Sequence, residues 1–317
     1  MNTITRLFGR SAIAATFAAT FTVATVCGIF AGTAHAEEGA TGKSSHFSWS
    51  WSFGNHVNYG DNRTKGSGVL KSESRTVAGF SRLVLALPAT VAVAQGPTES
   101  LTITTDDNLL PLMATRVEDD ALIIEGDKSR GFSTRQEIKI SLTVKSLNAI
   151  TIKGSGDVSG NQLTSDKLDV AIAGSGDVKF KTIRADQFRI AIEGSGDVAV
   201  DSIESQSVDA SIRGSGDIRL PLLQAKRVSI SVKGSGDVSA AGTADNVDVE
   251  IMGSGDVRTR KLVAREAKVT IMASGDAQVH ASEKLTATVQ GSGEVRYAGS
   301  PANITRTVSG SGSIRAL

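Results

Sequence analysis

The sequence predicts an all-β protein: a single-stranded β-helix (β-solenoid) with coils of about 20 residues, capped by an irregular N-terminal β region. Two observations carry this prediction. A Gly-Ser-Gly turn recurs along the second half of the chain, and short runs of alternating apolar and polar residues lie between its copies. No long amphipathic helix is indicated anywhere in the 317 residues.

The turn recurs every 18 to 20 residues, and such a short, nearly constant period is typical of a solenoid. Each coil must then turn at the same corner. Glycine permits the positive φ or the close backbone approach that such a corner requires. Ala273 stands in place of the first glycine in one copy, and the last copy begins at Gly310. The glycines that we predict to be structural are Gly154, Gly174, Gly194, Gly214, Gly234, Gly253 and Gly291.

Each repeat contains two short strands with one apolar edge. In residues 197–216, Val198 and Val200 form the edge of the first strand, and Val208 and Ile212 form that of the second. One repeat has too little apolar surface to fold alone, so stacked repeats must align these edges into a continuous core. A propeller fits less well, because each blade needs about 40 residues.

The start of the chain has the features of an export signal. Arg6 and Arg10 precede an apolar run, and "AHA" offers a cleavage site before Glu37. We therefore predict a signal peptide over residues 1–36. No second apolar stretch approaches the ~20 residues of a membrane-spanning helix, so we expect no transmembrane span after cleavage.

Three further segments follow. Residues 37–73 are polar and Gly/Ser-rich, which indicates a flexible tether, although Trp49 and Trp51 in "FSWSWSF" could instead lie on one face of a short strand. Residues 74–150 alternate strongly and are expected to form the N-terminal β region and cap, with "NLLPLMATRV" the one stretch suited to a helical turn. Residues 151–317 form the GSGD-repeat solenoid.

An acidic residue follows almost every turn, and stacking would bring these carboxylates about 4.8 Å apart. Two unit charges at that distance repel by roughly 0.9 kcal/mol in water, so the row needs an offset: raised pKa values, donated N–H groups or bound cations. We favour N–H groups from the Gly and Ser of the turns. Calcium is the alternative metal and the only cofactor considered, although one carboxylate per coil is a thin supply of ligands. The candidate calcium ladder is Asp157, Asp177, Asp197, Asp217, Asp237, Asp256 and Asp276.

Composition argues against several classes of function. The only cysteine, Cys27, lies in the signal segment, so the mature chain has no thiol for catalysis, metal binding or a disulfide. Loss of Arg6 and Arg10 leaves a net charge near −1, and nothing indicates nucleic-acid binding.

We do not expect an enzyme, although a carbohydrate-active β-helix, either a polysaccharide lyase or a hydrolase, is the alternative. The repeat spaces its carboxylates evenly, and His280 is the one histidine of the repeat region. No nucleophile elbow, phosphate loop or HExxH motif occurs. A second candidate surface is the small, flat outer face of the second strand, formed by Ala171, Ala191, Ser211, Ser231, Thr270 and Thr288.

Three features together resemble the head GIN domain family of auto-transporter adhesins: "RTVAGFSRLVLALPATVAVAQG", then "LTITTDDNLLPLMATRVEDDALII", then the run of "GSGDV" turns. They cover roughly residues 74–317. The resemblance implies a secreted or surface β-helical domain of bacteria without a known reaction, and it supplies no catalytic residues. No barrel-forming segment follows the repeats, so we do not expect self-transport.

These observations predict an exported, non-catalytic binding, adhesion or scaffold module of the bacterial envelope. It is expected in the periplasm, or secreted to the cell surface. Its partner is an unidentified surface, polysaccharide or protein, and the acidic ladder also offers a route to self-association.

Overall fold

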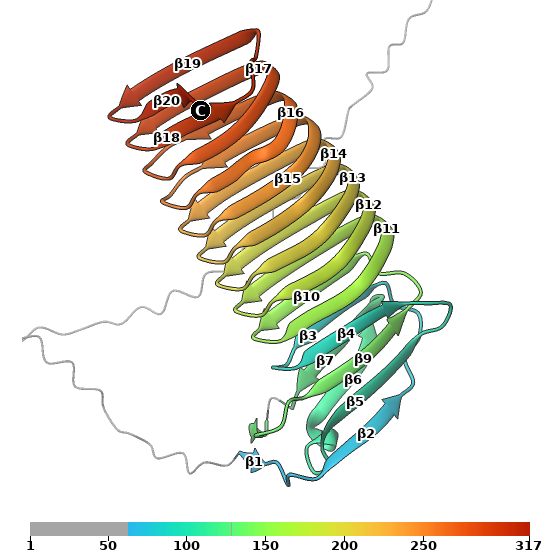
Figure 1. The fold of residues 1–317 in the computed structure, drawn as a ribbon. Helices are drawn as coiled ribbons and strands as arrows, with labels where there is room; N and C mark the ends of the chain where they lie inside the picture. The colour runs from blue at the N-terminus through green and yellow to red at the C-terminus, as the bar shows by residue number, and fades with distance from the viewer. Residues whose placement is uncertain (1–62, 128) are drawn as a thin grey trace, which may run out of the picture. The chain divides into compact units, whose positions relative to one another are not determined.

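The computed structural model describes residues 63–127 and 129–317, which belong to one compact unit, Asn58–Leu317 (Figure 1). The predicted signal peptide over residues 1–36 lies outside the described residues. So does most of the predicted tether, including Trp49 and Trp51.

The solenoid is a stack of coils whose strands pair in parallel and in register (Figure 1). Residues pair one repeat apart, as Val178 does with Val198. The all-β solenoid that the repeat predicts is therefore confirmed. Its strands are β10 (Ala149–Gly154), β11 (Asp157–Gly174), β12 (Val178–Gly194), β13 (Val198–Gly214), β14 (Ile218–Gly234), β15 (Val238–Ile251), β16 (Val257–Ile271), β17 (Ala277–Gly291), β18 (Glu294–Ala298), β19 (Asn303–Gly310) and β20 (Ser313–Ala316).

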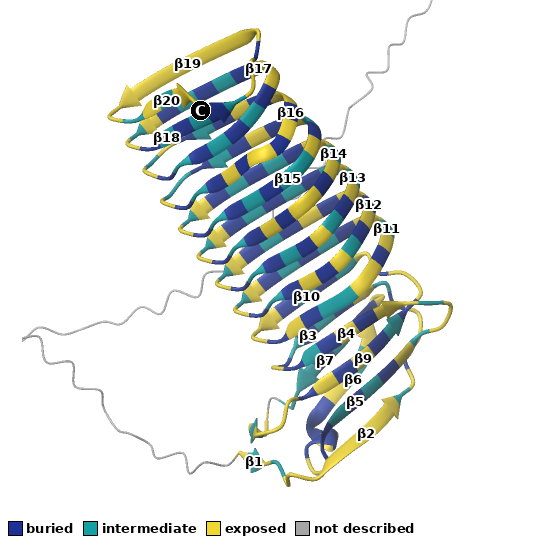
Figure 2. Ribbon diagram, viewed as in Figure 1, coloured by how far each residue is buried: buried dark blue, intermediate teal, exposed yellow. Residues whose placement is uncertain are grey.

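The core is a set of columns, each formed by one inward position repeated from coil to coil. Val198, Val200, Val208 and Ile212 of β13 are all buried, and Figure 2 shows buried residues alternating with more exposed ones along β11 to β17. Apolar alternation therefore becomes a continuous core by simple stacking.

The N-terminal β region continues the stack and then ends it. Strands β3 and β4 pair in parallel with β10 and β11, and β7 and β9 pair in parallel with β3 and β4. Beyond them β5 pairs antiparallel with β9, and β6 pairs antiparallel with β7. Leu110–Leu112 forms the helical turn that the sequence predicts. The elements here are β1 (Thr64–Lys65), β2 (Leu70–Arg75), β3 (Arg82–Ala86), β4 (Thr90–Gln95), β5 (Ser100–Asp106), β6 (Met113–Glu118), β7 (Ala121–Gly126), β8 (Phe132–Ser133) and β9 (Lys139–Val144).

The tether prediction is wrong for its C-terminal part, because β1 and β2 begin before residue 74. Strand β2 pairs antiparallel with β5, from Leu70 opposite Asp106 to Arg75 opposite Leu101. Its side chains are exposed on both faces except at Arg75, so no apolar alternation marks it in the sequence. The Arg75 guanidinium instead holds the strand by donating to the Leu110 carbonyl at 2.8 Å.

The last coil covers the opposite end of the core with a cation. Arg306 pairs in register with Ala287, an inward position, and its guanidinium lies 5.2 Å from the centroid of the Tyr297 ring. It also donates to the Tyr297 hydroxyl. A cation–π contact of this kind lets a polar residue close an apolar column. Ile304 and Val308 on either side of Arg306 remain exposed.

The two glycines of each turn are needed for different reasons. The first, such as Gly194, has a φ of +143°, and a Cβ there would lie 2.1 Å from the Gly174 carbonyl oxygen. The second, such as Gly216, needs no left-handed φ, but a Cβ would lie 2.0 Å from the Gly196 carbonyl oxygen. Gly253 and Ala273 occupy the same position in their turns without a positive φ.

We expect Gly216→Ala to destabilise the solenoid by about 1–3 kcal/mol, because its Cβ would overpack against the backbone of the preceding coil. Urea unfolding of the full chain measures this. Ser215→Ala, at the exposed middle position of the same turn, should stay within about 0.5 kcal/mol of the wild type. Equal effects of the two substitutions would show that the second glycine is not constrained by stacking.

Candidate functional site: the aspartate ladder and the adjoining groove

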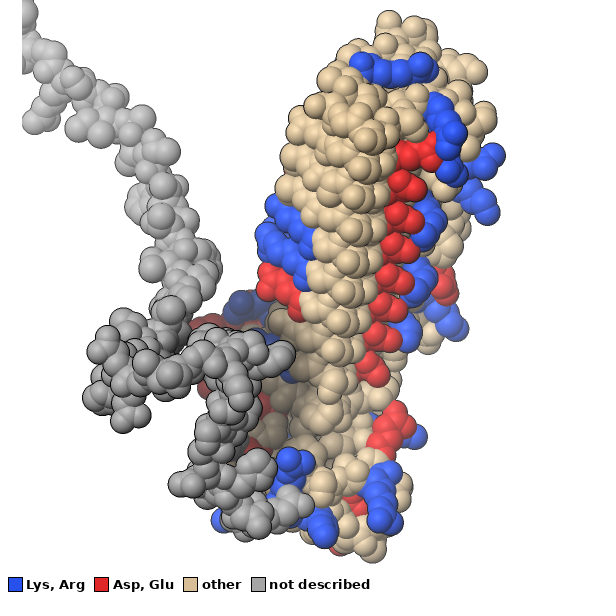
Figure 3. Space-filling model, turned by 90° about the vertical axis from the view of Figure 1, so that its left-hand side faces the viewer, with Lys and Arg blue, Asp and Glu red and all other residues tan. Residues whose placement is uncertain are grey.

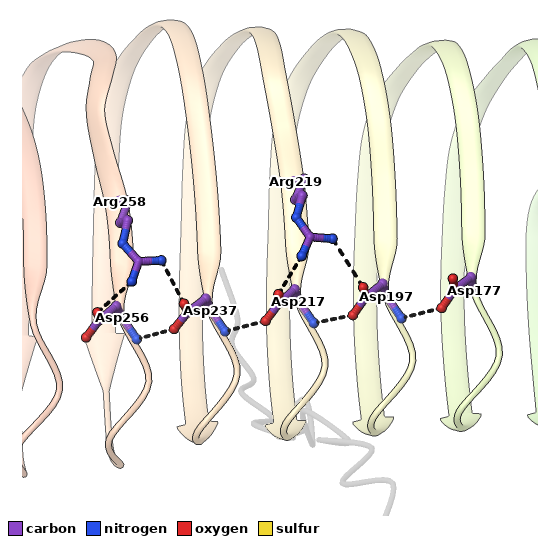
Figure 4. Close-up of polar contacts among 7 residues, drawn as sticks. All are labelled: Asp177, Asp197, Asp217, Arg219, Asp237, Asp256 and Arg258. Atoms are coloured by element: carbon purple, nitrogen blue, oxygen red, sulfur yellow. Dashed lines mark hydrogen bonds and ion pairs between the residues drawn. The ribbon is translucent and has the colours of Figure 1, made fainter.

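The acidic residues that follow the turns form a ladder joined by hydrogen bonds. The backbone N–H of each ladder residue donates to Oδ1 of the residue one coil earlier (Figure 4). The distances run from 2.8 Å for Asp177 to Asp157 up to 3.1 Å for Asp276 to Asp256. The chain of bonds ends with the N–H of Glu294 donating to Asp276 at 2.8 Å.

The Gly and Ser N–H groups, which the sequence analysis favoured as donors, bind elsewhere. Ser195 and Gly196 both donate to the Gly174 carbonyl of the preceding coil, at 2.9 Å and 3.2 Å. The predicted donors are therefore wrong, although N–H groups do serve the carboxylates. The register of the coils decides the donor, because it brings the next ladder residue's own N–H over each carboxylate.

Cations two residues after the ladder positions neutralise the other carboxylate oxygens. Arg219 bridges Asp197 and Asp217, with N–O distances of 3.1 Å and 2.6 Å (Figure 4). Arg258 bridges Asp237 and Asp256 in the same way, at 2.7 Å and 2.8 Å.

The intervening coils carry small residues at this position, Ala199 and Ser239. One guanidinium thus serves two carboxylates because it spans one coil spacing. Sequence reasoning missed this pairing, although the alternation of basic and small residues two places after each Asp was visible.

Two carboxylates of the ladder, those of Asp177 and Asp237, have lowered pKa values. Burial raises the pKa of Asp177, but hydrogen bonds from Lys179 and the Asp197 N–H outweigh it and hold the pKa below its ordinary value. Burial likewise raises the pKa of Asp237, and the Asp256 N–H and Arg258 outweigh it. A raised pKa is therefore not the offset at these two positions. Figure 3 shows the acidic row beside its basic neighbours.

Glu294 replaces aspartate near the end of the ladder and is held by two arginines. The Arg296 Nε donates to its carboxylate at 2.7 Å, and Arg315 also pairs with it. Hydrogen bonds from Arg296 and then Arg315 lower the pKa of Glu294 to about 2. The last coil thus joins the ladder through charge as well as stacking.

The calcium ladder stays a prediction, and the geometry gives it little support. No group of three or more His, Cys, Asp or Glu side chains in the part of the chain that the structure describes could hold a metal ion. The Oδ1 atoms already accept N–H groups. Calcium would also have to displace cations from the Oδ2 atoms of Asp177, Asp197, Asp217, Asp237 and Asp256.

A groove lies beside the ladder, on the outward side of the first strand of each coil. It consists of two adjoining hollows of about 710 Å³ and 700 Å³ that share Ala199 and Asp201. The first runs from β9 and β4 to β13, and the second from β13 to β17. Small residues form much of its floor, among them Pro221 and Ala241.

A β-bulge places two free cations in this groove. The pairing of β15 with β16 shifts between Ser239 and Ala241, and Arg260 and Lys261 both lie exposed at the shift. Within the described residues neither has an ion-pair partner. Thr259 before them is buried and donates to the Gln278 carbonyl at 3.0 Å. Bulges redirect side chains in this way.

The flat face predicted for the second strand is also present. Ala171, Ala191, Ser211 and Ser231 pair in register and form one half-buried column, which Glu250 interrupts before Thr270 and Thr288. His280 is half-buried between Val263 and Ala298. Across the described ranges, no helix is long and apolar enough to cross a membrane.

The fold and the ladder define a capped β-solenoid with a repeated acidic corner. The family model described as "Putative auto-transporter adhesin, head GIN domain" matches residues 79–202 and again residues 189–301. The chain therefore belongs to this family, as the sequence motifs indicated. A search of curated proteins finds no match.

Solved structures share the fold. A protein titled a putative adhesin from Parabacteroides merdae is 22% identical, with a TM-score of 0.65 over 81% of this chain and 99% of that chain. A putative adhesin from Parabacteroides distasonis is 25% identical, with a TM-score of 0.64 over 80% of this chain and 100% of its own. A protein from the same organism titled a putative lipid binding protein is 24% identical, with a TM-score of 0.64 over 80% and 99%.

We expect Arg219→Gln to lower the free energy of unfolding by about 1 kcal/mol at low ionic strength, because it leaves two stacked carboxylates without their cation. Arg213→Gln is the matched control, since Glu193 is the one ion-pair partner of Arg213 among the residues that the structure describes. It should cost less, and salt should reduce the difference. Urea unfolding measures both. Equal losses, or a wild-type midpoint that rises strongly with calcium, would contradict a ladder offset by arginine.

We also expect protonation of Glu294 to lower the free energy of unfolding in acid. Because its pKa falls from 4.5 to about 2 on folding, its contribution is present above pH 4.5 and is lost as the pH falls toward 2. Glu294→Gln should therefore be less stable than the wild type at neutral pH and equal to it near pH 2. Urea unfolding across this range, with the exposed Glu193→Gln as control, tests the sign. A difference that does not change with pH would contradict it.

Proposed function

We propose that this protein is an exported, non-catalytic binding module of the bacterial envelope or surface, and that its partner lies in the groove beside the ladder. Membership of an adhesin-like family supports binding of a partner. Export rests on the basic start, apolar run and cleavage pattern of residues 1–36.

The length of the groove is the observation that carries this proposal. Residues of nine strands line it, in the stacking order β9, β4 and then β11 to β17. Eight steps of ~4.8 Å make it roughly 38 Å long. A groove of this length suits an extended partner held along the solenoid axis.

The ladder chemistry favours binding over the carbohydrate-active alternative. A general acid or base needs a titratable oxygen in reach of substrate, with a pKa near the working pH. The pKa values of Asp177 and Asp237 are instead lowered, and their oxygens are held by N–H groups and cations. The carboxylates of the ladder thus act as structural acceptors.

Between the two candidate surfaces, the groove is the better binding site. It is hollowed, whereas the face of Ala191 and Ser211 is a flat column. It also presents Arg260 and Lys261, which have no ion-pair partner in the described part of the chain. A partner gains more contact, and more specific contact, in such a groove.

We expect Ala199→Trp to weaken retention of the protein on intact bacterial cells by about tenfold, because the indole would fill the part shared by both hollows. Ala191→Trp, on the flat face, is the matched control and should keep wild-type retention. Labelled full-length variants with unchanged unfolding midpoints are compared. If Ala191→Trp weakened retention and Ala199→Trp did not, the site would lie on the flat face. A wild-type protein that cells do not retain would contradict the proposed function.

A further inference from the structure

We propose that the groove recognises a linear acidic polysaccharide, whose anionic groups contact two separate rows of cations. This inference rests on the proposed function and names the ligand class for the same site. The rows are Lys179 and Lys181 on β12, and Arg258, Arg260 and Lys261 on β16. Arg219 on β14 also lines the groove between them, and the ladder holds its guanidinium through Asp197 and Asp217.

The separation of the rows indicates a polymer. Strands β12 and β16 are four steps apart in the stack, so the rows lie roughly 19 Å from each other. A single anionic head group reaches only one of them. A chain with a repeated anionic group reaches both, and joining the two contacts on one ligand raises affinity without new contacts.

The free cations in these rows can be recognised by their lack of partners. Lys179 and Arg258 already pair with the ladder, at 2.9 Å from Asp177 and 2.8 Å from Asp256. Lys181, Arg260 and Lys261 are exposed and have no ion pair among the described residues. Their donors are therefore available to a ligand, and the β16 bulge places two of them side by side.

The rest of the groove favours a sugar chain over a nucleic acid or a lipid. Bases need exposed aromatic rings for stacking, and Phe180, the one aromatic residue of the groove lining, is only 3% exposed. Lipid tails need an enclosed apolar pocket, whereas this groove is an open trough over small residues such as Ala199 and Pro221.

Asp201 is an acidic residue of the groove, so removing its charge should have the opposite effect on polyanion binding to removing the cations. It lies exposed between the two rows and has no ion pair within the described residues. As a carboxylate it can accept sugar hydroxyls, but it repels a passing anionic group. Removing its charge should therefore strengthen polyanion binding, while removing the cations weakens it.

The experiment measures binding of the full-length protein to immobilised polygalacturonate at low salt. The double variant Arg260→Gln, Lys261→Gln should bind about tenfold more weakly, since it removes two exposed charge contacts with the polyanion. The matched double variant Lys226→Gln, Arg227→Gln removes the same two charge types from exposed sites of β14 outside the groove and should bind as the wild type does. Asp201→Asn should bind more tightly, and added salt should weaken all of these interactions.

Other probes and outcomes separate the alternatives. Neutral dextran should not bind, and duplex DNA and phosphatidylglycerol vesicles should bind more weakly than polygalacturonate. Preference for DNA or vesicles would overturn the ligand class, and equal losses in the two double variants would overturn the site. If cells retain the wild type through the groove but polygalacturonate does not bind it, this inference fails while the proposed function stands.

Discussion

Neighbouring coils lie one strand spacing apart, about 4.8 Å, and in register, so each side chain meets its own counterpart in the coils on either side. This constraint explains why the corner repeats so faithfully. A Cβ at the second glycine would lie 2.0 Å from the carbonyl oxygen of the preceding Gly196. It also explains the core, where inward residues form columns. Gly160 and Phe180 are neighbours in one such column, and the Phe180 ring fills the space beside Gly160. A Cβ at Gly160 would lie 2.4 Å from that ring.

The same spacing creates the electrostatic problem that the ladder solves. Identical carboxylates at every corner repel one another, and register supplies one N–H donor per coil to each Oδ1. Arginine also offsets the repulsion. Because Arg219 and Arg258 each bind the carboxylates of two neighbouring coils, one arginine is needed for every two coils. Ala199 and Ser239 leave room where Arg219 and Arg258 reach back to the carboxylate of the preceding coil. The result is a row of carboxylates whose oxygens are bound by N–H groups on one side and, at five successive positions from Asp177 to Asp256, by cations on the other.

The sequence predicted the features that recur in every coil, and it did not predict those that depend on a single contact between coils. Period, alternation and turn glycines predicted the solenoid, because each coil repeats the same local chemistry. The donors to the ladder were misassigned, because the N–H of Asp197 reaches Asp177 only through inter-coil register. Strand β2 escaped notice because it is exposed on both faces and is held by Arg75 rather than by an apolar edge. The groove was not foreseen either, since it depends on outward residues from coils far apart in the sequence.

Departures from the repeat carry the information that a regular stack lacks. Three successive strand pairs lose their register on the groove side: at Leu220 to Leu223, at Ser239 to Ala241 and at Arg258 to Val263. Gly242 absorbs the first of these with a φ of +129° and a Cβ position 2.0 Å from the Leu223 carbonyl oxygen. Each irregularity interrupts the backbone hydrogen bonding between neighbouring strands. Their concentration beside Arg260 and Lys261 changes the backbone of these coils as well as their side chains, and so distinguishes this part of the groove from the regular stack.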